Sequence, residues 1–129
     1  MKMVAWLTAG TLAFLSVVLI NLDFASGQTP PAKTSELLSR GKKIYEEKCA
    51  ICHGAQGNAQ TPMAQVLKPL PRDFTQPLTE WAVSKGEPVK IFKVIKEGIP
   101  NSPMVKFDLP DEDVWALVHT VREFSTERK

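Results

Sequence analysis

Cys49-Ala50-Ile51-Cys52-His53 contains both cysteines of the 129-residue chain and one of its two histidines. This C-x-x-C-H spacing is the attachment signature of c-type haem. Two residues between the thiols allow each sulfur to form a thioether with one vinyl group on the same porphyrin edge, and the adjacent histidine can give the iron an imidazole nitrogen. The motif therefore predicts one covalently attached haem c, bound through Cys49 and Cys52, with His53 as the proximal metal ligand.

Paired cysteines also serve three other chemistries, and the rest of the sequence fits each of them less well. A thioredoxin-like redox pair needs a βαβ unit, but the chain shows no convincing run of strand alternation. A structural zinc site needs four nitrogen or sulfur ligands. Outside the motif the sequence offers only the distant His119, which we interpret as a satisfied or solvent-facing histidine. A disulfide across two residues is strained, so the haem interpretation is favoured.

The sequence on either side of the motif predicts an all-α domain. Upstream, Thr34 or Ser35 can cap a helix, and apolar residues then recur at helical spacing up to the first cysteine. Downstream, Pro88 can open a helix that ends at Gly98. Asp111 begins an acidic first turn that favours a last helix with one apolar stripe. The main helices are thus expected over about 35–49, 88–97 and from 111 onward.

The long segment 54–86 is rich in glycine and proline and leaves room only for short helical turns, expected at about 62–67 and 79–85. Such a long loop is unusual in a compact domain unless it wraps a bound group, which agrees with a haem. The same loop holds Arg72 and Trp81, two candidates for donating hydrogen bonds to the haem propionates. For Arg72, solvation at the surface is the alternative.

The N-terminal end of the chain has the features of an export signal. Val4 to Ile20 is a run of seventeen uncharged residues that follows the positive charge of Lys2. This run is longer than the core of a cleaved signal peptide, about 7–15 residues, and lies at the lower limit of a spanning helix, about 17–25 residues. Cleavage before Gln28 would release a periplasmic domain, whereas an uncleaved segment would tether the domain to the outer face of the inner membrane. The expected organisation is a signal peptide or membrane anchor over 1–27, a linker over 28–34 and one domain over 35–129.

Composition and charge limit the class of partner. Hydrophobic residues make up 43% of the chain and charged residues 23%, as in ordinary globular domains. The formal net charge is +2, far below the positive excess of a nucleic-acid-binding domain. No nucleic-acid partner is therefore expected, and electrostatic recognition has to come from a local patch.

Three segments around the motif carry a resemblance to a known family. Gly41-Lys42-Lys43-Ile44-Tyr45 precedes the motif, Val94-Ile95-Lys96-Glu97-Gly98 ends the middle helix, and Ser102-Pro103-Met104 follows it. Together with the terminal helix, these segments resemble the small monohaem bacterial cytochromes c over nearly all of 35–124. The resemblance implies a cytochrome c-like fold, in which about three main helices and short turns wrap one haem c. It also implies that the first and last helices cross at Gly41 and Tyr45.

The sixth ligand of the iron is expected to be Met104. It follows Pro103 in an irregular segment between two helices, where prolines can hold the backbone while the thioether is aimed at the iron. In the family, a methionine some tens of residues beyond the haem motif fills this position, although here Val105 replaces the proline that usually follows it. Met63 lies only ten residues beyond His53 and is expected to pack on the haem edge instead.

A haem with protein ligands at both axial positions has no open site for a substrate, so the expected function is electron transport rather than catalysis. A methionine ligand and a buried pocket both favour a positive reduction potential. The alternatives are a haem-carrying subunit of a larger oxidoreductase, and a sensor or peroxidase in which Met104 leaves the sixth site open. The expected partners are redox proteins with acidic docking surfaces, steered by lysines near the haem. The candidate lysines are Lys42, Lys43, Lys48, Lys68, Lys85 and Lys106.

Overall fold

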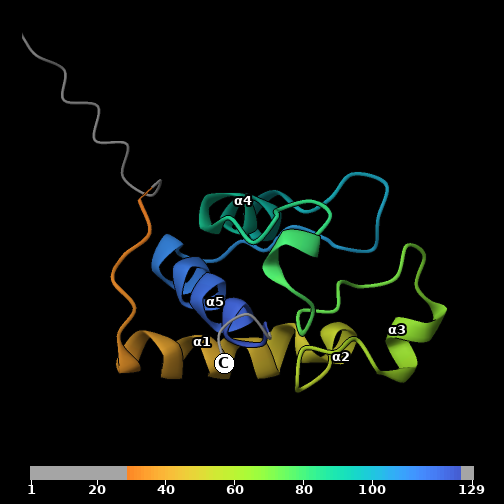
Figure 1. Cartoon of the computed structure of the whole chain (residues 1–129), viewed down its shortest axis with the longest axis horizontal. Coiled ribbons are helices and arrows are strands. Elements are labelled where there is room, and N and C mark those ends of the chain that lie inside the picture. Colours follow the sequence, from red (N-terminus) through yellow and green to blue (C-terminus); the bar gives the residue numbers. More distant parts are fainter. Residues whose placement is uncertain (1–28, 126–129) are drawn as a thin grey trace, which may run out of the picture.

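The structure is a computed structural model that describes residues 29–125, and these residues contain helices and no strand (Figure 1). The export signal predicted over 1–27 lies outside the described residues. Within 29–125, no helix combines the length and the hydropathy needed to cross a membrane.

The three long helices begin and end close to the predicted residues. They are α1 (Ser35–Lys48), α4 (Pro88–Glu97) and α5 (Asp111–Glu123). Their ends follow local chemistry: the Thr34 hydroxyl accepts a hydrogen bond from the Leu37 N–H at 3.1 Å, and α4 ends at Gly98, whose φ is 74°. The predicted all-α fold is confirmed.

Short helical turns occupy the segment between α1 and α4. They are α2 (Ala50–His53), α3 (Pro62–Val66) and the 3-10 turn η1 (Leu78–Glu80). The turn predicted at 79–85 is divided in two, because the backbone at Trp81 is extended, with ψ at 104°. η1 precedes Trp81, and a second turn follows it, in which the Lys85 N–H donates to the Trp81 carbonyl oxygen at 2.8 Å. The helix predicted over 35–49 is also divided at its end, since Cys49 caps both α1 and α2.

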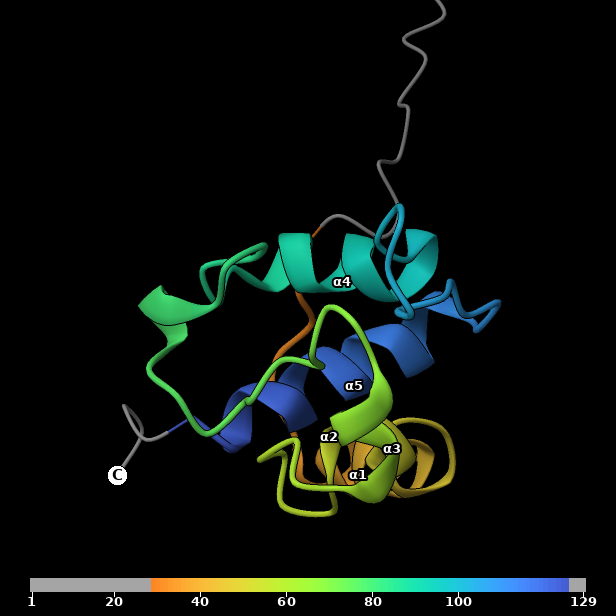
Figure 2. The ribbon, with the colours of Figure 1, turned by 90° about the vertical axis from the view of Figure 1, so that its right-hand side faces the viewer.

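α5 lies between α4 and α1 and forms the centre of the core (Figures 1 and 2). Every residue from Val114 to Val121 is buried, although the sequence predicts one apolar stripe only. Ile91 and Ile95 of α4 join the same hydrophobic cluster as the buried residues of α5. Because neighbouring segments cover α5 on several sides, its polar residues His119 and Thr120 are buried as well.

α1 and α5 cross where Gly41 meets Ala116. A Cβ atom at Gly41 would overlap the Ala116 carbonyl oxygen and Thr120 Oγ1, so the two backbones approach closely only because residue 41 has no side chain. One turn further along α1, Tyr45 is 1% exposed. Its ring packs against that of Phe124, with 5.1 Å between the centroids. The crossing predicted at Gly41 and Tyr45 is therefore present.

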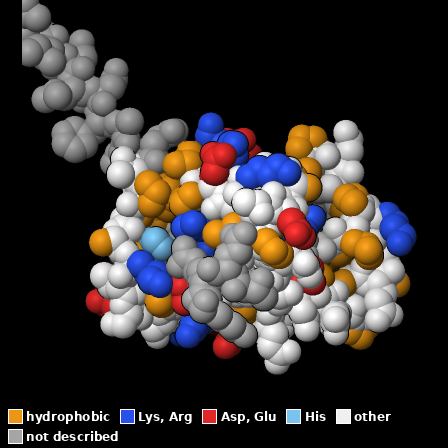
Figure 3. Space-filling view, in the orientation of Figure 1, with side chains coloured by type: hydrophobic (Ala, Val, Ile, Leu, Met, Phe, Trp, Pro, Cys, Tyr) orange, Lys and Arg blue, Asp and Glu red, His pale blue; other side chains and the backbone are white. Residues whose placement is uncertain are grey.

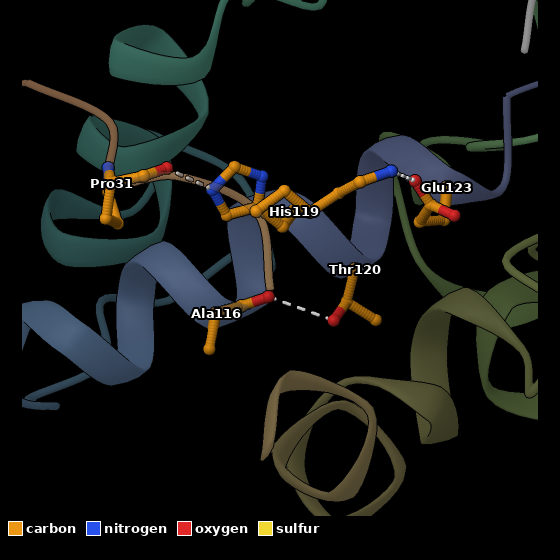
Figure 4. Close-up of polar contacts among 6 residues, drawn as sticks. Pro31, Ala116, His119, Thr120 and Glu123 are labelled. Atoms are coloured by element: carbon orange, nitrogen blue, oxygen red, sulfur yellow. Dashed lines mark hydrogen bonds and ion pairs between the residues drawn. The ribbon is translucent and has the colours of Figure 1, made fainter. Parts of the chain in front are cut away.

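The segment that precedes α1 is attached to α5 (Figure 4). His119 Nε2 donates to the Pro31 carbonyl oxygen at 3.0 Å, and Lys33 Nζ lies 2.8 Å from Glu123 Oε1. His119 is thus a satisfied histidine, one of the two alternatives that the sequence allows. The described part of the linker predicted over 28–34 contains no helix but is held on the domain.

Candidate haem-binding site

Cys49, Cys52 and His53 lie on one helical turn at the end of α1. The Cys49 carbonyl oxygen accepts hydrogen bonds from the backbone N–H groups of Cys52, at 3.1 Å, and of His53, at 2.9 Å. Residues three and four apart on such a turn share a side, so the turn brings two thiols and an imidazole together. The two cysteines form no disulfide, and both are partly buried.

The imidazole of His53 is held in one orientation by the main chain. Its Nδ1 lies 3.0 Å from the Arg72 carbonyl oxygen. Because a carbonyl only accepts, Nδ1 carries the hydrogen and the lone pair of Nε2 is left for a metal. The Phe74 ring stacks on the imidazole, with centroids 4.5 Å apart and an interplanar angle of 18°. Burial lowers the pKa of His53 and outweighs the hydrogen bond to Arg72, so the ring is held neutral, as a metal ligand must be.

The end of the motif is fastened to the helices on both sides. Tyr45 Oη donates to the Gly54 carbonyl oxygen at 2.7 Å in a buried environment. Burial, with a smaller effect of Cys49, raises the pKa of Tyr45, so the phenol remains a neutral donor. Thr61, which caps α3, donates its hydroxyl to the Ile51 carbonyl oxygen at 2.8 Å. α1 and α3 therefore both fix the position of the turn.

Burial disfavours the thiolate form of Cys49. Its pKa is raised to about 11, first by burial and then by Cys52, against a smaller lowering by Lys48. A redox-active or nucleophilic cysteine has a lowered pKa, so the site does not fit the thioredoxin-like alternative. Two neighbouring thiols beside an imidazole with a free Nε2 are, by contrast, the donor set that a covalently attached haem requires.

Met104 lies half-buried in the loop that follows α4. The Ile99 N–H donates to the Met104 carbonyl oxygen at 2.9 Å, and the Met104 N–H donates to Ser102 Oγ at 3.1 Å. A Cβ atom at Gly98 would lie 2.8 Å from both the Met104 carbonyl oxygen and the Lys106 nitrogen. These contacts fix the backbone of Met104 within its own loop and against the end of α4. The hydrogen bonds of Met104 do not reach the turn that holds the two cysteines.

The structure gives contacts of the two long-loop residues that the sequence offers as donors to the haem propionates. Trp81 is 2% exposed and its indole N–H donates to the Gln76 carbonyl oxygen at 3.1 Å, so this donor is already satisfied and is not free for a haem propionate. Arg72 is half-buried, and its main-chain carbonyl, not its guanidinium, contacts His53. Sequence reasoning missed this contact because every residue type has a carbonyl.

The all-helical fold and the C-x-x-C-H turn define a small c-type cytochrome. Residues 36–119 match the family model described as "Cytochrome C oxidase, cbb3-type, subunit III", and the chain belongs to this family. A member of this family carries covalently bound haem c with its iron and acts in electron transfer. The predicted cofactor and the predicted class of protein are confirmed.

Three similar proteins, two of them longer than this chain, were found. The chain is 29% identical over 83 residues to a thiosulfate dehydrogenase of Thiomonas intermedia (strain K12). This match covers 62% of the chain and 24% of the dehydrogenase. A chain of the Kuenenia stuttgartiensis reducing HAO-like protein complex Kustc0457/Kustc0458 matches with a TM-score of 0.61 and 26% identity, over 78% of this chain and 48% of that one. The KustC0563 c-type cytochrome matches with a TM-score of 0.54 and 34% identity, over 67% of this chain and 98% of that one. The chain thus spans about a quarter of the dehydrogenase and half of the HAO-like chain.

Proposed function

We propose that this protein carries single electrons through one haem c, bound as thioethers by Cys49 and Cys52, with His53 and Met104 as axial ligands. The observation that carries the proposal is the hydrogen bond from His53 Nδ1 to the Arg72 carbonyl oxygen, because it leaves Nε2 free on the turn that also holds both thiols. The sequence has no other cysteine for attachment. When bound, the haem supplies an iron that alternates between the ferric and ferrous states.

Met104 is the methionine best suited to the second axial position. Met1 and Met3 belong to the N-terminal segment, and Met63 is 41% exposed on α3. A thioether ligand stabilises ferrous iron and raises the reduction potential. With His53 and Met104 on the two axial positions, no coordination site is left for a substrate, so the protein is an electron carrier and not itself a catalyst.

A second candidate function is that of a haem-carrying subunit of a larger oxidoreductase. It is supported by the coverage of the similar proteins, since the chain matches 24% of a thiosulfate dehydrogenase and 48% of a chain from an HAO-like complex. In that role the cytochrome would pass electrons to or from a catalytic partner. Stoichiometric copurification of a large subunit supports this function, whereas a haem protein that isolates alone and reduces a separate acceptor supports the shuttle. A sensor or peroxidase remains the third alternative and requires that Met104 does not bind the iron.

The proposed location is the periplasm, either free or tethered to the inner membrane through the uncharged segment Val4 to Ile20. The support is the seventeen-residue run after Lys2 and the small residues that precede Gln28. The intact mass of the natively exported protein distinguishes the cleaved from the anchored form.

Redox partners with acidic docking surfaces are proposed on the basis of charge. Six exposed lysines close in sequence to segments expected to contact the haem form no ion pair with any residue in 29–125. Exposed amines without ion pairs can steer an acidic partner at low ionic strength. The six are Lys42, Lys43, Lys48, Lys68, Lys85 and Lys106.

Met104→Ala tests the ligand assignment, and Met63→Ala is its matched control. Loss of the thioether should abolish the charge-transfer band of ferric haem bound to methionine, open the sixth position to added imidazole and lower the reduction potential. Met63→Ala should leave the band in place and the sixth position closed to imidazole. Loss of the band in Met63→Ala but not in Met104→Ala would show that Met63 of α3, and not Met104, binds the iron. High-spin iron in the wild type would contradict the electron-carrier function.

A further inference from the structure

The exposed apolar side chains of the domain concentrate at one corner. Of the six large hydrophobic residues that are exposed within 29–125, four lie between residues 51 and 70. Single exposed apolar residues are ordinary, whereas a cluster of them marks an interaction site. We name these four residues the α2–α3 corner; they are Ile51, 63% exposed, Met63, 41%, Val66, 73%, and Leu70, 62%.

A hydrogen bond joins α2 to the start of α3, so Ile51 lies close to this helix. Thr61, at the start of α3, donates its hydroxyl to the Ile51 carbonyl oxygen at 2.8 Å. Met63 and Val66 are three residues apart in α3 and therefore share a face. Ala64 lies between them in sequence, is 2% exposed and anchors the opposite face of α3 in the interior. The exposed apolar side chains are thus held outward by packing on the other side.

The sequence of the corner carries positive charge and no acidic residue, whereas the exposed Glu46 and Glu47 come just before it. Between Lys48 and Arg72 the chain contains no Asp or Glu, and Lys68 is exposed two residues before Leu70. Figure 3 shows hydrophobic and basic side chains at the end of the molecule that carries α3, with no acidic side chain over that helix. The next acidic residue, Asp73, accepts hydrogen bonds from Thr75.

We propose that the α2–α3 corner is the docking surface for the redox partner of this cytochrome, and that the partner presents an apolar centre with Asp and Glu at its rim. The inference rests on the proposed function. Ile51 lies between Cys49 and Cys52, so thioethers at these cysteines attach the porphyrin edge next to the corner. The apolar residues provide the contact that excludes water, and the exposed Lys48 and Lys68 select the acidic rim.

Voltammetry of the full-length holoprotein on a defined surface tests this proposal. A gold electrode coated with mixed methyl- and carboxylate-terminated alkanethiols imitates a partner with an apolar centre and an acidic rim. Val66→Glu removes apolar surface and adds a repelling charge, and Val83→Glu is the matched control, since Val83 is a 57% exposed valine in the segment before α4. We expect Val66→Glu to lower the electron-exchange rate on the mixed layer about tenfold and Val83→Glu less than about twofold.

Val66→Lys separates the apolar from the electrostatic part of the interaction. The electron-exchange rate of Val66→Lys should equal that of the wild type on a purely carboxylate layer and be lower than that of the wild type on the mixed layer. Equal losses for Val66→Glu and Val83→Glu would show that only net charge matters and would overturn the proposal. A wild type that exchanges electrons no faster on the mixed layer than on the carboxylate layer would do the same.

Two further measurements test whether a second copy of the chain binds the corner and whether Val66→Glu leaves the haem site intact. If sedimentation shows a wild-type dimer that Val66→Glu dissociates, the corner binds a second copy and the proposal is wrong. The ferric spectrum and the midpoint potential of Val66→Glu should equal those of the wild type, because residue 66 is not an iron ligand. If the wild-type iron lacks a methionine ligand, the proposed function fails, while the comparison of the two glutamate variants still decides whether the corner docks.

Discussion

His53 is aligned by the main chain of Arg72, whose carbonyl oxygen lies 3.0 Å from the imidazole Nδ1 although the two residues are nineteen positions apart. The bond needs no particular side chain at position 72, but it needs the loop after α3 to return to the motif. Phe74 holds that loop, because its N–H donates to the Gly57 carbonyl oxygen at 2.6 Å and its ring packs on Trp81 at 5.1 Å between centroids. The orientation of the proximal ligand thus depends on a loop anchored in the core.

Asp73 should make the stability of this loop depend on pH. Burial would raise the pKa of Asp73, but hydrogen bonds from Thr75 and Gln76 and the charge of Arg72 together lower it. A carboxyl whose folded-state pKa is lowered contributes stability above its ordinary pKa of about 4, and loses it as the pH falls through the folded value. We therefore expect the free energy of unfolding of the wild type to exceed that of Asp73→Asn near pH 6 and to approach it near pH 3, with both values taken from urea titrations. A difference that is constant with pH would assign the effect to something other than this carboxylate.

Tyr45→Phe should lower the free energy of unfolding by about 1–3 kcal/mol, because the buried Gly54 carbonyl loses its hydrogen-bond donor. The phenyl ring keeps its contact with Phe124, so the change isolates the hydroxyl. Denaturant titration of the holoprotein measures the loss. An unchanged unfolding midpoint would mean that Tyr45 does not fasten the motif to α1.

The predictable parts of the fold are those that local chemistry dictates. Thr34, Pro88 and Gly98 mark helix ends through capping, a fixed φ and a left-handed backbone, and α1 and α4 begin and end where these residues place them. The C-x-x-C-H turn is predictable for the same reason, since its chemistry depends on spacing within five residues.

The parts that could not be predicted depend on contacts between distant segments. His119 meets Pro31 across 88 positions and His53 meets Arg72 across 19, and both partners are main-chain carbonyls, which leave no mark in the sequence. The burial of α5 around nearly its whole circumference is also a tertiary effect, because its own pattern shows one apolar stripe. The sequence offers Trp81 as a donor to a haem propionate, but its indole N–H donates to the Gln76 carbonyl oxygen instead.

Gly41→Ala should destabilise the protein, although the same change in an exposed helix gains about 1 kcal/mol. The new methyl group would overlap the Ala116 carbonyl oxygen, a backbone atom that cannot turn aside as a side chain can. We expect a loss of about 2 kcal/mol or more in the free energy of unfolding from overpacking. Ser39→Ala, an exposed position in the same helix, is the control and should have little effect. A gain in stability at position 41 would contradict the close crossing of α1 and α5.

Gly98→Ala should disturb the loop that carries Met104. The residue has a φ of 74°, and its Cβ would lie 2.8 Å from the Met104 carbonyl oxygen, so strain and overlap together should cost about 1–3 kcal/mol. The informative readout is the absorption band of methionine-bound ferric haem, which should weaken. Gly86→Ala has a similar φ of 72° and would meet Leu78 instead, so it should lower stability and leave the band intact. If the band were equally strong in Gly98→Ala and Gly86→Ala, Gly98 would have no part in positioning the Met104 ligand.

Intact mass and thiol count of the protein, produced in a host that matures c-type cytochromes, test the covalent attachment most directly. Thioethers at Cys49 and Cys52 predict a mass equal to the exported chain plus one haem, with no thiol available to an alkylating reagent after denaturation. A colourless protein at the mass of the polypeptide alone, with both cysteines alkylated, would contradict the assignment of this turn as the haem-binding site.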